Sequence, residues 1–69
     1  RHIMTFAEKL LALRKEKGLT QTEVAKELGI VVRAYQRYEH GDRTPPMETL
    51  IALADLYDIT LDELVCRQR

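Results

Sequence analysis

Serine is absent from these 69 residues, and cysteine occurs once, as Cys66. A lone cysteine cannot close an internal disulfide, and it lacks the spaced partners that a zinc site needs. We therefore predict a reducing, cytoplasmic compartment and no metal or other cofactor. The single cysteine has no base at a recognisable spacing, serine is absent as a nucleophile, and no glycine-rich phosphate loop occurs. The sequence therefore predicts a protein that is not an enzyme.

Long apolar runs are also missing. None approaches the roughly 20 residues that cross a bilayer, and no signal peptide precedes the first amphipathic segment, so we predict no membrane partner. A chain this short buries only about 60% of its unfolded surface, which leaves no evident pocket for a small-molecule effector. We expect one domain spanning residues 4–69, with residues 1–3 a non-native extension before Met4.

Net charge is zero, because eleven Lys and Arg residues balance eleven Asp and Glu residues. The two signs are unevenly distributed. Residues 1–45 hold nine bases and six acids, a balance of +3, whereas residues 46–69 hold two bases and five acids, a balance of −3. The basic N-terminal two thirds permits DNA binding through a local patch.

Alternating strand patterns are absent, and the apolar spacing is helical throughout. Helix starts are marked by Thr followed three residues later by Glu, the capping-box pattern, at Thr5, Thr20 and Thr60. Helix stops are marked by the three glycines, and Pro46 suits the first turn of a helix. The sequence predicts an all-α, five-helix domain, with helices at about residues 5–17, 21–28, 32–40, 47–57 and 61–66.

The second and third predicted helices have the spacing of a helix-turn-helix, since only about three residues separate them. Ala25 supplies a small residue where the two helices touch, and Gly29 takes a left-handed turn at low cost. Inward positions carry apolar or aromatic side chains: Val24, Leu28, Ile30, Tyr35 and Tyr38. We therefore predict a compact bihelical unit with both tyrosines in the core.

The third predicted helix divides into two arcs on a wheel of about 100° per residue. Its outward arc contains Val32, Arg33, Gln36 and Arg37. Arginine pairs with guanine, glutamine with adenine, and a valine methyl packs on the thymine methyl. On an isolated helix such an arc is more often a solvated face. Within a helix-turn-helix we predict that it contacts DNA bases.

The span from about Phe6 to Val65 resembles the Cro/C1-repressor type of helix-turn-helix domain, a large family of phage and prokaryotic regulators. The resemblance is carried by LRKEKGLTQTEVAKELGI and by RYEHGDRTPPMETLIALADLYDITLDELV. It implies a repressor-like fold and a sequence-specific transcriptional regulator of double-stranded DNA, which we expect to be a repressor. It also implies DNA backbone contacts for Thr20, Gln21, His40 and Arg43.

The resemblance further implies a structural ion pair between Arg14 and Glu39. That pair makes independent sense, because a carboxylate near a helix C-terminus needs a nearby cation. Three residues depart from the family pattern. Val31 occupies the helix-cap position that usually holds Ser or Thr, which costs about 1 kcal/mol. Tyr35 replaces a smaller aliphatic residue, and His40 replaces a common Asn.

A domain this small reads too few base pairs alone, so we expect a homodimer on a palindromic site with half-sites about one helical turn apart. The predicted dimer interface is Leu61, Leu64 and Val65, because the last helix is too short to bury them all. The alternative is a protein-interaction module, such as an antitoxin or anti-repressor, whose main partner is another protein. Zero net charge and the acidic C-terminal third favour that alternative.

Overall fold

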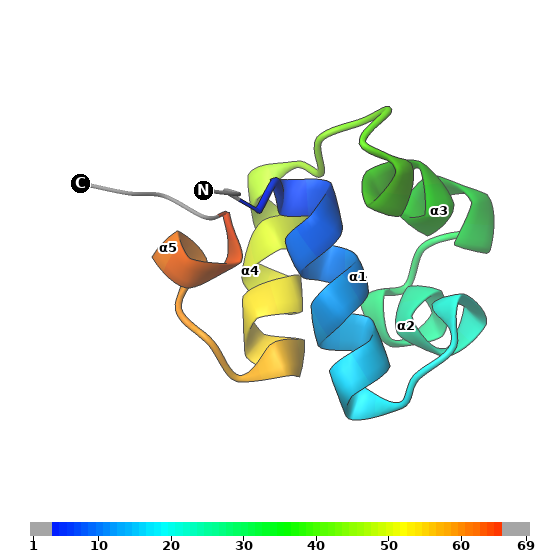
Figure 1. Ribbon diagram of the computed structural model, residues 1–69. Coiled ribbons are helices and arrows are strands. Elements are labelled where there is room, and N and C mark those ends of the chain that lie inside the picture. Colours follow the sequence, from blue (N-terminus) through cyan, green and yellow to red (C-terminus); the bar gives the residue numbers. More distant parts are fainter. Residues whose placement is uncertain (1–3, 66–69) are drawn as a thin grey trace.

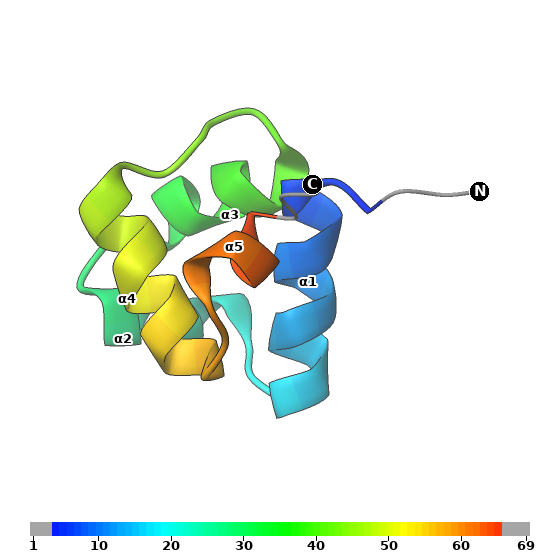
Figure 2. The same cartoon turned by 90° about the vertical axis from the view of Figure 1, so that its left-hand side faces the viewer.

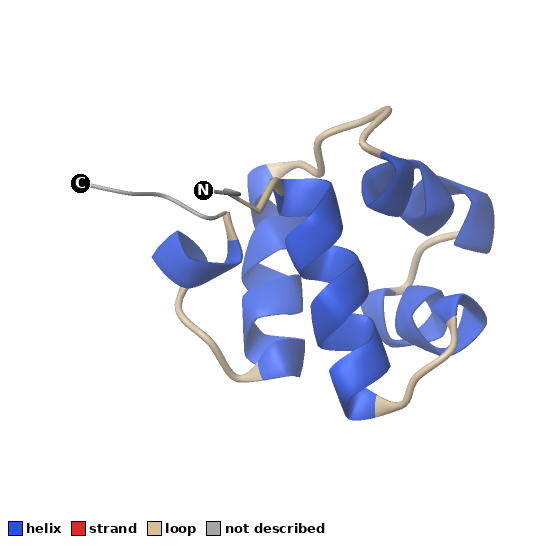
Figure 3. Ribbon diagram, in the orientation of Figure 1, coloured by secondary structure: helices blue, strands red, loops and turns tan. Residues whose placement is uncertain are grey.

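The computed structural model describes residues 4–65, and over this range it contains helices and no strand (Figures 1 and 3). The helices are α1 (Phe6–Lys17), α2 (Gln21–Leu28), α3 (Val32–His40), α4 (Met47–Tyr57) and α5 (Leu61–Leu64). The predicted all-α class is confirmed. The predicted fifth helix was too long, because α5 ends at Leu64; Cys66 lies outside the described residues.

The threonines begin their helices as predicted. At Thr20, the Glu23 backbone N–H donates to Oγ1 at 3.1 Å, and the Thr20 N–H donates to Glu23 Oε1 at 2.8 Å. Thr5 forms the same reciprocal pair with Glu8, and Thr60 Oγ1 accepts from the backbone N–H of Glu63. Each contact satisfies an amide that the first helical turn leaves without a partner.

The core draws one or more side chains from every helix. α1 packs against α3, α4 and α5, while α2 packs against α3 and α4. In Figure 1, α1 and α4 stand at the centre, with α2 and α3 on one side and α5 on the other; in Figure 2, seen from the side of α5, this helix lies in front, between α4 and α1. The most deeply buried side chains are those of Leu10, Val24, Tyr35, Leu53 and Leu64.

The burial of Leu64 corrects the predicted dimer interface. Its side chain is fully buried within its own chain, because α5 packs against α1 and α4 and turns this residue into the core. Leu64 is therefore not available at a surface, and that part of the prediction is wrong. Leu61 is partly buried and Val65 is exposed.

Within residues 4–65, no helix is long and apolar enough to cross a membrane.

Candidate nucleic-acid interface

The turn between α2 and α3 is built on Gly29, whose φ of 72° places it in the left-handed region. Its N–H donates to the Lys26 carbonyl at 3.1 Å, and the Ile30 N–H donates to the Ala25 carbonyl at 3.0 Å. These two bonds form a Schellman motif, which closes the end of a helix. Ile30 then packs against the core, and Val31 in extended backbone leads into α3.

The α3 helix has one buried and one exposed face. Tyr35 and Tyr38 are buried as predicted. The core therefore accommodates the ring of Tyr35 at a position where the family pattern has a smaller aliphatic residue. All four predicted base-contact residues lie together on the exposed face: Val32, Arg33, Gln36 and Arg37. The first turn of α3 holds no acid, and its last turn holds Arg37 and His40. The only acid of α3, Glu39, has a side chain that is 3% exposed, so the exposed face of this helix carries basic and uncharged side chains.

The predicted backbone-contact residues differ in exposure. Thr20 is exposed at the start of α2, His40 at the end of α3, and Arg43 in the segment that leads to α4. Gln21 is half-buried, and its side chain is already engaged in hydrogen bonds within the protein. The structure thus gives Gln21 partners that the sequence did not reveal.

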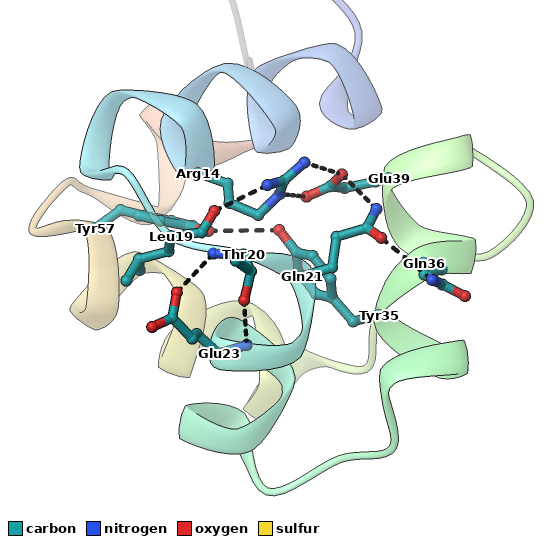
Figure 4. Close-up of polar contacts among 9 residues, drawn as sticks. All are labelled: Arg14, Leu19, Thr20, Gln21, Glu23, Tyr35, Gln36, Glu39 and Tyr57. Atoms are coloured by element: carbon teal, nitrogen blue, oxygen red, sulfur yellow. Dashed lines mark hydrogen bonds and ion pairs between the residues drawn. The ribbon is translucent and has the colours of Figure 1, made fainter.

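Arg14 and Glu39 form a two-point ion pair beneath this surface (Figure 4). Arg14 Nε donates to Glu39 Oε2 at 2.6 Å, and a terminal nitrogen donates to Oε1 at 3.2 Å. The other terminal nitrogen donates to the Leu19 carbonyl at 2.9 Å. The side chains are only 14% and 3% exposed, respectively. The pair therefore ties α1 and the α1–α2 connection to the end of α3.

Electrostatics keep both partners ionised. Burial alone would raise the pKa of the Glu39 carboxyl, but hydrogen bonds from Arg14, Tyr35 and Gln21 outweigh it and hold that pKa below its usual value. The hydrogen bond to Glu39 raises the pKa of the Arg14 guanidinium. Glu39 is thus the acceptor at the centre of a polar cluster inside a small apolar core.

Two tyrosine hydroxyls extend this cluster toward α4. The hydroxyls of Tyr35 and Tyr57 lie 3.4 Å apart, within hydrogen-bond distance. Either hydroxyl can donate to the other, because a phenol is both a donor and an acceptor. Burial raises the pKa of both phenols, which keeps them protonated as donors. No sequence spacing signals this contact, because Tyr35 and Tyr57 lie 22 positions apart.

Comparison with known proteins decides the family. The model of the helix-turn-helix family matches residues 10–64. The chain belongs to the helix-turn-helix family of the Cro/C1 type. This match confirms the helix-turn-helix that the sequence predicted over the residues of α2 and α3.

This helix-turn-helix chain is similar to proteins named as regulators. It is 41% identical to the cryptic phage CTXphi transcriptional repressor RstR of Vibrio cholerae, over 93% of this chain and 57% of that protein. A transcriptional regulator from Listeria innocua has a TM-score of 0.90 and 37% identity, over 94% of this chain and 61% of that one. The chain therefore spans less than two thirds of either relative.

One solved structure of the same fold includes DNA. It is the P22 c2 repressor in complex with a synthetic operator, with a TM-score of 0.85 and 26% identity, over 90% of this chain and 94% of that one. The individual DNA contacts assigned to this helix-turn-helix chain stay predictions.

Proposed function

We propose that this chain binds double-stranded DNA in a sequence-specific manner and represses transcription, with α3 in the major groove. The observation that carries the proposal is the exposed face of α3, where the four predicted base-contact residues gather. The names of RstR and of the operator-bound P22 c2 repressor support it.

Each residue of the exposed face has a suitable base partner. Arg33 and Arg37 offer paired donors to guanine, and Gln36 offers a donor and an acceptor to adenine. Val32 is 36% exposed, so its methyls can pack on a thymine methyl. These contacts would supply sequence preference, whereas contacts to the DNA backbone would fix the register of the protein.

The DNA backbone would be met from three places. The start of α2 presents backbone amides beside Thr20, a setting that favours phosphate. His40 and Arg43 are exposed in and after the last turn of α3. Gln21 has a second amide hydrogen beyond the one it gives to Glu39, so a phosphate contact is compatible with its internal bonds.

The proposal includes a homodimer on a palindromic operator. Leu61 is partly buried and Val65 is exposed, and these two are the remaining candidates for the interface once Leu64 is assigned to the core. Sedimentation with and without DNA tests this. A protein that stays monomeric at high micromolar concentration in both conditions would overturn the dimer.

The experiment that tests DNA reading is selection of bound duplexes from a randomised pool. It compares the wild type, Arg33→Ala and a control, Lys15→Ala, which removes the same charge from an exposed position of α1. We expect a palindromic motif for the wild type and for Lys15→Ala, with one position per half-site relaxed in Arg33→Ala.

Salt dependence separates DNA reading from the protein-partner alternative. DNA binding must weaken as salt rises, because each neutralised phosphate releases counterions, with a slope of about −0.9 per phosphate. No enrichment of any sequence across a range of salt would contradict the proposal. It would favour a module that binds another protein.

A further inference from the structure

A chain of hydrogen bonds runs from α1 to the exposed face of α3 (Figure 4). Arg14 donates to Glu39, as described above. Gln21 Nε2 then donates to Glu39 Oε1 at 3.0 Å. At the far end, Gln36 Nε2 donates to Gln21 Oε1 at 3.2 Å. Gln36, a predicted reader of adenine, is therefore linked through Gln21 to the buried ion pair.

The chemistry of the chain fixes which way each amide points. A carboxylate can only accept, so Gln21 must turn its NH₂ group toward Glu39. Its carbonyl oxygen then faces α3, and Gln36 must turn its own NH₂ group toward that oxygen. The orientation of the exposed amide is thus set by the charge of a residue that is itself buried.

The restrained Gln36 amide keeps one N–H and its carbonyl oxygen for other partners. Adenine presents one acceptor, N7, and one donor, the N6 amino group, in the major groove, and a glutamine amide satisfies both. An unrestrained glutamine would have to lose rotamer freedom when it binds. Here part of that ordering is present before DNA arrives.

We propose that Gln21 and Glu39 are positioning residues that orient Gln36 for adenine, an inference that rests on the proposed DNA-binding function. Gln21 would then shape base preference through Gln36. That role differs from a contact with the DNA backbone, which would strengthen binding to every sequence alike.

The test uses Gln21→Met, which removes both hydrogen bonds and keeps a long, helix-compatible side chain. Thr22→Met is the matched control, because it places the same side chain at the adjacent, exposed position of α2. Both are compared with the wild type, Gln36→Ala and Arg33→Ala in selection from a randomised pool. We expect Gln21→Met and Gln36→Ala to relax the same base pair, each losing about tenfold of its adenine preference. Arg33→Ala should relax a different one.

The outcomes separate this inference from the function beneath it. Uniform weakening by Gln21→Met with an unchanged motif would overturn the positioning role and leave the DNA-binding function standing. No motif for the wild type would overturn both.

A second measurement needs no DNA. In the free protein, the nitrogen-15 side-chain amide signals of Gln36 should shift in Gln21→Met and stay in place in Thr22→Met. Unmoved signals in Gln21→Met would also overturn the positioning role.

Discussion

Replacing Arg14 by methionine should remove a large share of the stability of this domain. Glu39 would keep its charge at a site where its side chain is 3% exposed, and the Leu19 carbonyl would lose its donor. Breaking a buried ion pair from one side costs about 3–5 kcal/mol. A 69-residue domain has a total stability of roughly 3–10 kcal/mol, at about 0.05–0.15 kcal/mol per residue. Arg14→Met should therefore lose roughly a third or more of its free energy of unfolding and unfold at a lower urea concentration than the wild type.

The assay is urea unfolding followed by circular dichroism at pH 7. Lys15→Met is the matched control, because it removes one positive charge from the neighbouring exposed position and should change stability by less than about 0.5 kcal/mol. The double variant Arg14→Met with Glu39→Leu should recover much of the loss, since no buried charge remains unpaired. A loss below about 1 kcal/mol for Arg14→Met would place this pair among ordinary surface ion pairs and refute the reasoning.

Three further predictions concern pH, the start of α3 and the end of α5. Because the folded-state pKa of Glu39 lies below its ordinary value of 4.5, its contribution to stability is present above that value and is lost as pH falls through the folded-state pKa. Urea titrations from pH 7 to pH 3 should show this loss in the wild type and much less of it in the Arg14→Met and Glu39→Leu double variant. Val31→Ser should raise stability by about 1 kcal/mol, because Val31 is 70% exposed and gives α3 no side-chain cap; thermal unfolding should show a midpoint raised by about 4–8 °C. Leu64→Ala should lower the free energy of unfolding by about 2–5 kcal/mol even in dilute monomer, whereas Val65→Ala should lower it much less. Equal small effects of the two variants in urea unfolding would show that Leu64 is not part of the core.

Local signals predicted the helix starts, because a capping threonine meets an amide only three residues away. Thr5, Thr20 and Thr60 each begin a helix within one residue of the predicted start. The inward-facing Tyr35 and Tyr38 were also predictable, since the two faces of a helix follow from its period. These features depend on neighbours along the chain and need no knowledge of the tertiary structure.

Contacts between distant residues were not predictable in the same way. The bond from Gln21 to Glu39 spans 18 positions, and that from Gln36 to Gln21 spans 15. No sequence spacing signals such pairs. Leu64 was misplaced for a related reason: a four-residue helix has too little periodicity to show which side faces the core.

The α3 helix is thus secured unequally along its length. At its start, Val31 offers no side-chain acceptor to the first-turn amides, in contrast to the threonines that begin α1, α2 and α5. At its end, Glu39 accepts from donors on α1 and α2. Departures from local sequence rules concentrate where a protein binds something, while the rest of the fold supplies the compensating stability. The buried cluster around Glu39 therefore stabilises the helix and also reaches its exposed face through Gln21, so one set of contacts can serve both folding and base reading.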